Sequence, residues 1–488
     1  MANVPLQLGI VTAYLLVALA VGLLAYRVTD RTAEDYYLAS RTFGTVVLLF
    51  TTFATLLSAF TFFGGPNISA KAGPEWILVM GTMDGILFAV LWYVIGYKQW
   101  LLGQHEGYLT LGEMLGDRFG STALRVLVAA VSIFWLFPYV MLQQQGAGTA
   151  LVALTEGAVP YWVGAGGITL FMIVYVTLAG MRGVAWTDTL QGLFMLVMVW
   201  GAFVWVLAAV GGPTAATSKL ANTNPEFLTL GGGLYSPQYV ISTAVSIAFG
   251  VAMFPQVNQR FFVAESKTVL KRTFALWPVL VILLFVPAFM LGTWAAGYGI
   301  SPADGNVLPL LLNEFTPGWF AALVVAGAMA AMMSSSDSML LSGSSYFTRD
   351  VYRPLVREAS DRREAFLGRV GVAVFATASF VASLFQPATL LEIGDTAFGG
   401  FAQLALPVIV ALYWPRTTRW GMYAGIGLSQ AFYLSSVFVG FVPGTYFGGW
   451  SASVVGMVLG LVFTVGVSAV TTPDAAEDPS VYEGLSAD

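Results

Sequence analysis

The sequence has no cysteine and a single histidine, His105. Thiolate metal sites, disulfides and catalysis by a cysteine or a serine–histidine pair therefore lack the side chains that they need. Charged residues are also scarce, at 10% of the 488 residues, whereas 57% are hydrophobic. This balance points to a membrane protein and away from a soluble enzyme.

The hydrophobic residues gather in thirteen runs separated by mostly short connections. A helix needs about 20 apolar residues to cross a hydrocarbon core of about 30 Å. The runs are too long for barrel strands and lack apolar/polar alternation, which disfavours a β-barrel. We predict an all-α polytopic membrane protein with spans at residues 6–26, 44–70, 76–100, 122–153, 161–179, 187–210, 238–261, 273–297, 319–347, 367–386, 391–414, 420–441 and 448–470.

The placement of positive charge predicts the orientation, because basic residues are retained on the cytoplasmic side. Every odd-numbered gap between the runs is basic, including the gap after the seventh run, to which we assign Arg260. The even-numbered gaps hold only Lys71 and Lys219. We therefore expect a multi-pass protein of the cell membrane with its N-terminus outside and its C-terminus in the cytoplasm. On this assignment no Lys or Arg lies at mid-membrane depth.

Two of the runs are interrupted by helix-breaking residues at corresponding positions. Gly64, Gly65 and Pro66 interrupt the second run, and Gly250 and Pro255 interrupt the seventh. Transporters built from inverted repeats place broken helices at matching positions in their two halves. The alternative is that Gly and Pro are simply common in membrane helices. The pairing favours two five-helix repeats of opposite direction, with one extra helix before them and two after.

This reading divides the chain into six parts. They are an N-terminal helix and cytoplasmic loop (1–43), a first repeat (44–210), an extracellular loop (211–237), a second repeat (238–415), two C-terminal helices (416–470) and a disordered acidic cytoplasmic tail (471–488). Thr110, three residues before Glu113, predicts a capped surface helix on the inside.

The ninth run contains a cluster of oxygen-bearing residues on one helix face. Ala331, Ser334 and Ser335 fall at i, i+3 and i+4, so one carbonyl and two hydroxyls lie together. A hard cation such as sodium takes several oxygen ligands. One helix cannot complete that shell, but the free carbonyls of a broken helix could. The alternative is close packing of small residues between helices.

Several longer motifs accompany this cluster: "EDYYLASR" at 34–41, "FATLLSAFTFFGGP" at 53–66, "GMRGVAWTDTLQG" at 180–192, "PQVNQRFFVAES" at 255–266 and "AAMMSSSDS" at 330–338. With them, residues 6–440 resemble the sodium/solute symporter family. The resemblance implies a LeuT-like 5+5 fold and sodium-coupled import of a small organic solute by alternating access. It does not imply an enzyme.

The resemblance also implies the positions of the ion sites. The shared sodium site maps onto the carbonyls of Ala54, Leu57 and Ala331 and the hydroxyls of Ser334 and Ser335. A second cation site, found in some members, maps onto Asp188 with Asp337 and Ser338. Asp337 departs from the family pattern, and it could strengthen that site, pair with another group or carry a proton. Asp188 could instead cap a helix start.

The solute is expected between the two broken helices near the middle of the membrane. The predicted lining residues are Thr61, Phe62, Phe63, Gln143, Gln144, Gln145, Phe254, Gln256 and Gln403. Consecutive glutamines cannot all face one side, and some of the aromatic residues could be core packing only. Asp84 lies mid-run without a predicted partner.

The motifs "SAFTFFGGP" and "PYVMLQQQGAG" look most like the monocarboxylate and pantothenate branch, so we expect a small carboxylate as the solute. Proline, another amino acid or a sugar are alternatives. Proton coupling on the same fold and a transporter-like sensor are further alternatives. The expected partners are sodium, the solute and the lipid bilayer, with no nucleic acid and a monomeric functional unit.

Overall fold

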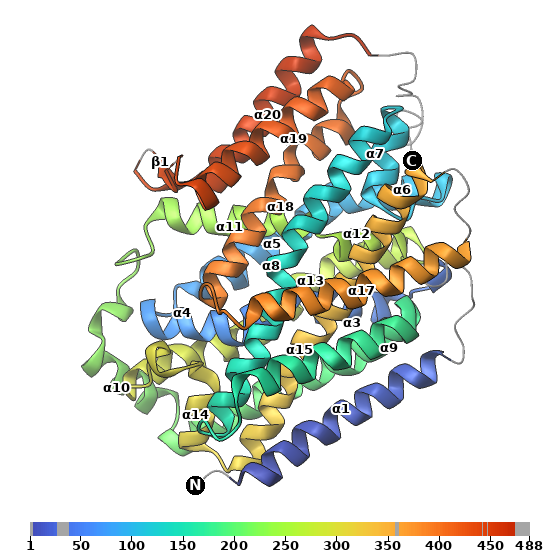
Figure 1. Cartoon of the computed structure of the whole chain (residues 1–488). Coiled ribbons are helices and arrows are strands. Elements are labelled where there is room, and N and C mark those ends of the chain that lie inside the picture. The colour runs from blue at the N-terminus through green and yellow to red at the C-terminus, as the bar shows by residue number, and fades with distance from the viewer. Residues whose placement is uncertain (1–2, 27–38, 357–360, 442, 447, 474–488) are drawn as a thin grey trace.

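The chain folds into a bundle of long helices in the computed structural model. The helices lie side by side, with α1 (Val4–Tyr26) and α20 (Ala452–Val470) at opposite edges (Figure 1). The all-α prediction is confirmed. The structure describes residues 3–26, 39–356, 361–441, 443–446 and 448–473. Most of the predicted tail, residues 474–488, and the side chain of Asp84 lie outside this described part.

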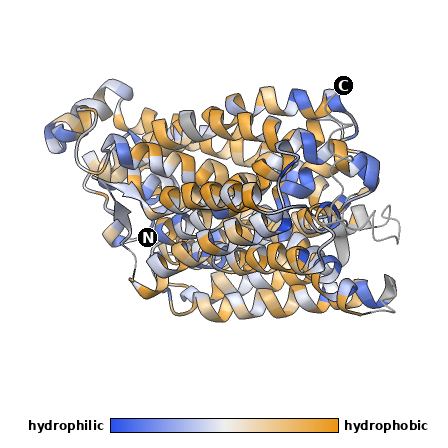
Figure 2. Ribbon diagram, turned by 90° about the horizontal axis from the view of Figure 1, so that it is seen from above, coloured by the Kyte–Doolittle hydropathy of each residue, from blue (hydrophilic) through white to orange (hydrophobic). Residues whose placement is uncertain are grey.

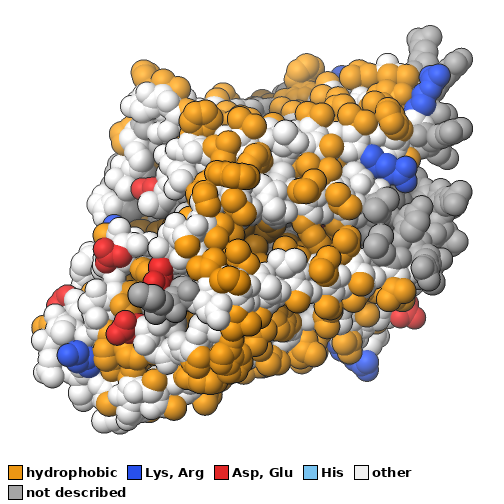
Figure 3. Space-filling view, turned by 60° about the horizontal axis from the view of Figure 1, so that its bottom comes forward, with side chains coloured by type: hydrophobic (Ala, Val, Ile, Leu, Met, Phe, Trp, Pro, Cys, Tyr) orange, Lys and Arg blue, Asp and Glu red, His pale blue; other side chains and the backbone are white. Residues whose placement is uncertain are grey.

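Within the described residues, ten helices are long and apolar enough to cross a membrane, and two bent pairs of helices raise the number to twelve. The remaining predicted run, 161–179, corresponds to the shorter apolar helix Tyr161–Thr177, so the number thirteen stays a prediction. Hydrophobic residues cover the middle of the bundle and hydrophilic residues gather at its two ends (Figure 2). The surface shows the same division, with a broad apolar face between charged ends (Figure 3). Such a surface suits a lipid bilayer.

The first predicted repeat begins after the short turn η1 (Ala39–Arg41). Its elements are α3 (Thr45–Leu56), η2 (Phe60–Gly64), α4 (Gly65–Ala72), η3 (Ile77–Asp84), α5 (Gly85–Leu91), η4 (Trp92–Gly96), α6 (Tyr97–Glu106), α7 (Leu111–Arg118), α8 (Thr122–Leu154) and α9 (Tyr161–Val210). α9 is two helices joined at a kink at Gly180, whose φ of 59° and ψ of −169° are open essentially to glycine alone. This kink separates the fifth predicted run from the sixth.

The second predicted repeat follows a connection that contains α10 (Pro213–Thr223) and η5 (Pro225–Leu228). Its elements are α11 (Pro237–Ala252), α12 (Pro255–Phe262), α13 (Lys267–Gly297), η6 (Pro302–Asp304), α14 (Val307–Phe315), α15 (Gly318–Ser345), η7 (Tyr346–Tyr352), α16 (Arg353–Leu355), α17 (Asp361–Ser383) and α18 (Leu390–Tyr413). The chain continues through α19 (Arg419–Leu434), η8 (Ser435–Val439) and the antiparallel strands β1 (Thr445–Tyr446) and β2 (Trp450–Ser451) to α20.

The helix α7 corrects one prediction. Thr110 caps it as expected, since its Oγ1 accepts a hydrogen bond from the Glu113 N–H at 3.0 Å. The helix does not lie on the surface, however, because most of its residues are buried. The Glu113 carboxylate forms ion pairs with Arg125 of α8 at 2.9 Å and Arg349 of η7 at 2.8 Å. These pairs hold α7 against the end of the bundle.

The helix α15 lies at the centre of the architecture. It is the most enclosed of the candidate spans, whereas α1 is among the least. It packs against α9, α8, α3 and α12. Nearly all of its residues from Phe320 to Ser345 are buried, including the serines of the oxygen cluster. The cluster therefore faces other helices on all sides, which positions it for an ion site inside the bundle.

Candidate functional site

Two broken helices meet α15 inside the bundle. α3 ends at Leu56, and Leu57 is extended, with φ of −81° and ψ of 127°. The next helical stretch begins at Phe60, and the two segments bend by 61°. In the second repeat, α11 and α12 bend by 55° around Met253 and Phe254. The prediction that both runs are broken is confirmed.

The position of the first break differs from the expected one. The sequence pattern indicates Gly64 to Pro66, but the helix opens earlier, around Leu57 and Ser58. Pro66 instead lies inside the continuous helical stretch Phe60–Ala72, shortly after the π-helical turn η2, and it does not open the helix there. The second break falls directly before Pro255, where the pattern placed it.

The structure brings the predicted sodium ligands together. The Ser334 hydroxyl donates to the Ala54 carbonyl at 2.6 Å, and it lies 3.1 Å from the Ala331 carbonyl oxygen. The Ser335 hydroxyl lies 2.7 Å from the Leu57 carbonyl oxygen. It also contacts the carbonyl of Thr55 at 2.9 Å, an oxygen that the sequence did not single out. All of these residues are buried.

This arrangement suits sodium. The break at Leu57 frees carbonyls that an intact helix would use in its own hydrogen bonds. The serine hydroxyls bond to these carbonyls here, and a hydroxyl can turn its hydrogen away and offer a lone pair instead. Neutral oxygens from two helices are the ligands that a hard cation takes. The residues present therefore fit a transported sodium ion, and the assignment stays a prediction.

The surroundings of Asp188 correct the placement of Arg260. We assigned Arg260 to a cytoplasmic loop, but it lies on α12 and is fully buried. Its Nη2 is 3.1 Å from the Asp188 Oδ2 and 2.6 Å from the Ser338 hydroxyl. The expectation that Arg260 lies in a loop was therefore wrong. Loop assignment by charge failed because the partner of Arg260 is distant in the sequence, on α9.

Asp188 and Ser338, predicted to hold a second cation, thus surround a guanidinium group. Asp188 also accepts from Thr51 at 2.6 Å and lies 3.3 Å from the Thr55 hydroxyl, both on α3. It does not cap a helix start, because it lies within α9, beyond the kink. The remaining predicted ligand, Asp337, is buried, and neither carboxylate oxygen has a hydrogen-bond partner among the described residues.

Aromatic side chains gather beside the two breaks. Phe254, at the second break, lies 5.6 Å from Phe398 and 5.0 Å from Tyr139 between ring centroids. Phe60, after the first break, lies 5.1 Å from Phe398. Thr61 and Phe62 are also buried on η2. The aromatic cluster Phe60, Tyr139, Phe254 and Phe398 therefore joins the two broken helices, with α8 and α18 beside them.

Polar groups next to this cluster come from Gln143 and Gln256. The Gln143 Oε1 accepts from the backbone N–H of Ala59, within the first break, at 2.9 Å. The Tyr139 hydroxyl lies 3.1 Å from that of Ser58. Gln256 follows the second break, and both of its side-chain polar atoms are buried without a partner among the described residues.

Other predicted solute residues are not brought to the breaks. Gln144 donates to Thr169 of α9 and to the Ala376 carbonyl of α17. Gln145 donates to the Ala388 carbonyl. Gln403 donates to the Ser453 carbonyl of α20. Each amide bonds to a neighbouring helix or loop. The direction of a buried side chain depends on which helices pack beside it, and the sequence alone does not show those neighbours.

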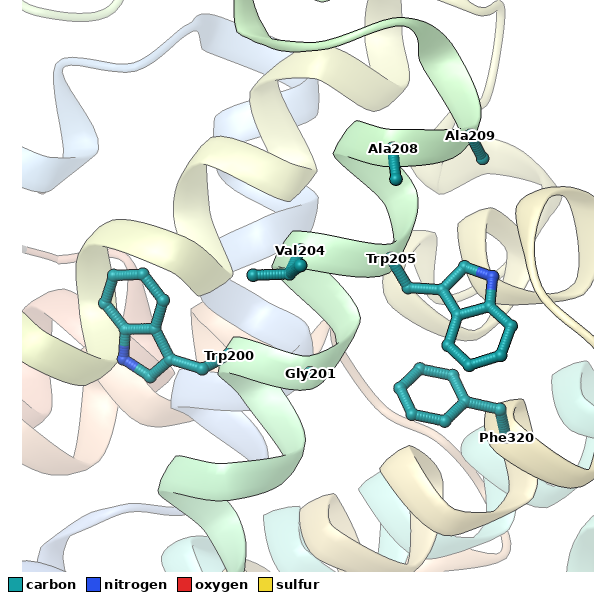
Figure 4. A pocket seen from close by; sticks show the side chains of 7 residues that line it. All are labelled: Trp200, Gly201, Val204, Trp205, Ala208, Ala209 and Phe320. Carbon is teal, nitrogen blue, oxygen red and sulfur yellow. The ribbon is translucent and has the colours of Figure 1, made fainter.

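A separate surface recess lies on α9 and α15 (Figure 4). It is lined by apolar side chains, among them Trp200, Val204 and Trp205, and Trp205 stacks on Phe320 at 4.6 Å between centroids. None of its lining residues belongs to a broken helix. It is therefore distinct from the ion and solute region.

The comparison with known proteins decides the family. The model of the sodium:solute symporter family matches residues 36–428. The chain belongs to the sodium:solute symporter family. The protein is thus a multi-pass membrane transporter and not an enzyme, and it carries out sodium-coupled symport of a small solute.

Among the relatives of this symporter is the sodium/pantothenate symporter of Escherichia coli (strain K12), 28% identical over 88% of this chain and 91% of that protein. The sodium/proline symporter of Haemophilus influenzae (strain ATCC 51907 / DSM 11121 / KW20 / Rd) is 28% identical over 85% of each chain. A solved structure of a Na+-coupled sialic acid symporter in an outward-open state has a TM-score of 0.81 at 20% identity, covering 96% of this chain and 98% of that one. The last comparison shows the fold.

Proposed function

We propose that this symporter imports a small carboxylate together with sodium bound by the oxygens of Ala54, Leu57, Ala331, Ser334 and Ser335. The observation that carries the proposal is the meeting of the two serine hydroxyls with the carbonyls of the broken α3. An ion at this position joins α3 to α15. The ion would therefore bind more tightly to the conformation in which these helices are close. Coupling requires such a difference in affinity between two conformations.

The relatives and the solute region support a carboxylate. Pantothenate and proline, which appear in the names of the relatives, both carry a carboxylate group. The aromatic cluster offers an apolar surface to the remainder of such a solute, with Gln143 and Gln256 as polar contacts. Arg260 is already paired with Asp188. The negative charge of the solute would therefore be balanced by the bound sodium.

Reconstituted proteoliposomes test both parts of the proposal. Uptake of radiolabelled pantothenate, proline, lactate, pyruvate, acetate and glucose is measured under an inward sodium gradient alone and then under a pH gradient alone. We expect accumulation of pantothenate or one of the monocarboxylates under the sodium gradient only, whereas accumulation of proline or glucose supports the alternative solutes. Accumulation under the pH gradient alone supports the proton-coupled alternative. Binding in a thermal-shift screen without accumulation under either gradient supports the transporter-like sensor.

A further inference from the structure

The apolar recess on α9 lies on a face of the bundle that would contact lipid (Figure 4). It has a volume of about 650 Å³ and belongs to the candidate span Gly180–Val210, most of which is not buried inside the bundle. Its lining residues are Trp200, Gly201, Val204, Trp205, Ala208, Ala209 and Phe320, and none of them is charged. The part of a ligand that enters this recess must therefore be apolar.

The aromatic walls of the recess are held by contacts within the protein. The Trp200 Nε1 donates a hydrogen bond to the Leu283 carbonyl of α13 at 2.8 Å. On the other side, Trp205 stacks on Phe320 of α15, with 4.6 Å between ring centroids. Gly201 lies between these walls, and a Cβ there would stand 3.3 Å from the Phe320 ring. The hollow is therefore already formed, as is usual for a ligand site.

The recess has about the length of one leaflet of a bilayer. At about 1.5 Å per residue, α9 rises about 14 Å between Trp200 and Ala209, which is about half of a hydrocarbon core of about 30 Å. Ala209 lies one residue before the end of α9. Trp319, in the first turn of α15, lies 5.8 Å from Trp205 between ring centroids. Because tryptophan is enriched at the level of the lipid headgroups, the recess begins near that level and extends towards the middle of the membrane.

We propose that the recess binds one acyl chain of a phospholipid, whose headgroup lies at the level of Trp205 and Trp319. An acyl chain is narrow and flexible, so it can fill a hollow between fixed aromatic rings, and an empty hollow would lose dispersion contacts. A second copy of the protein fits less well. Inside a membrane an apolar surface gives protein no hydrophobic advantage over lipid, and a partner helix would follow α9 across the whole core.

Native mass spectrometry of the purified protein tests the proposal by counting bound phospholipid. After extraction from cell membranes in a mild detergent, we expect one phospholipid per wild-type chain. Val204→Trp places an indole in the recess, and we expect bound phospholipid per chain to fall at least about fivefold. The matched control is Val197→Trp. It adds the same bulk to α9 outside the recess, at a position 53% exposed compared with 61% for Val204, and it should keep the wild-type amount.

Photocrosslinking locates the bound chain in the wild type, and it remains decisive if Val204→Trp does not fold. The protein is reconstituted in vesicles of phosphatidylethanolamine and phosphatidylglycerol, with a diazirine in the acyl chain of a fraction of the phosphatidylethanolamine. We expect crosslinks to concentrate on residues 200–209.

Four results would overturn the proposal. They are no phospholipid on the wild type, equal loss in the two tryptophan variants, crosslinks spread evenly over all exposed helices, and a wild-type dimer that only Val204→Trp converts to a monomer. The last result would assign the recess to a second copy of the protein.

Discussion

Single hydroxyls on α15 differ in what they contact, although they are adjacent in the sequence. Ser335 reaches the carbonyls of Thr55 and Leu57 at the end of the broken α3, whereas Ser336 bonds, among the residues that the structure describes, only to the Met332 carbonyl of its own helix at 2.7 Å. Both are fully buried. Burial therefore does not distinguish them, and any difference in sodium dependence must come from the direction of the hydroxyl.

This contrast gives a matched prediction for transport. Ser335→Ala is expected to raise the sodium concentration for half-maximal uptake about tenfold or more, equivalent to roughly 1.4 kcal/mol of lost ion binding. Ser336→Ala removes the same atom from the same helix, and we expect a change of less than about twofold, since its hydrogen bond is local. Sodium titration of solute uptake into proteoliposomes measures both. Similar effects of the two substitutions would contradict the assigned ligands.

The buried pair of Asp188 and Arg260 has consequences for stability. Asp188→Asn leaves the Arg260 guanidinium without its carboxylate partner inside the bundle. Breaking a buried ion pair in this way lowers the free energy of unfolding by about 3 to 5 kcal/mol. We expect a clear fall in the thermal unfolding midpoint of the detergent-solubilised protein. The double variant Asp188→Asn with Arg260→Met removes both charges, so we expect a large part of the loss to be recovered. Losses that simply add would show that the two residues do not interact.

The elements around the second break pack more closely than their separation in the sequence suggests. The Cβ of an alanine at Gly250 of α11 would stand 2.3 Å from the Phe398 carbonyl oxygen of α18. Phe398 in turn stacks on Phe254 at the break. The glycine therefore permits the contact that brings α18 and its aromatic ring to the solute region.

Gly250→Ala is expected to push α11 away from α18. Overpacking of this kind lowers the free energy of unfolding by about 1 to 3 kcal/mol. Solute uptake should fall strongly and the thermal midpoint should decrease. The control is Gly427→Ala on α19, where a Cβ would meet nothing within 4 Å. We expect no loss there, because alanine is the better helix former. Uptake and thermal unfolding are measured on both variants, and an undisturbed Gly250→Ala protein would contradict the close packing.

At the level of elements, the sequence predicts local features better than distant partners. The spacing of Ala331, Ser334 and Ser335 is a property of one helix, so their shared face follows from the sequence alone. The pairing of Arg260 with Asp188 depends on how α12 packs against α9, and no local pattern contains that information. For the same reason, the position of Gln403 in an apolar run indicates that its amide needs a hydrogen-bond partner. The sequence does not indicate which helix provides that partner.

The whole molecule has two charged ends separated by an apolar middle (Figure 3). One end holds the ion pairs of Glu113 with Arg125 and Arg349, and Arg125 also pairs with the buried Asp350 at 2.9 Å. These pairs tie α7, α8 and η7 together. We expect this end to face the cytoplasm, because the basic gaps lie there. The orientation itself remains a prediction.

The lack of cysteine makes the orientation simple to test. Wild-type protein gives no background reaction with a maleimide, since it contains no thiol. Lys219 of α10 and Arg416 after α18 are both exposed, and they are predicted to lie on opposite sides of the membrane. In intact cells a membrane-impermeant maleimide is expected to label Lys219→Cys. Arg416→Cys should react only after permeabilisation. The reverse pattern would invert the orientation, and labelling of both in intact cells would contradict an odd number of spans between them.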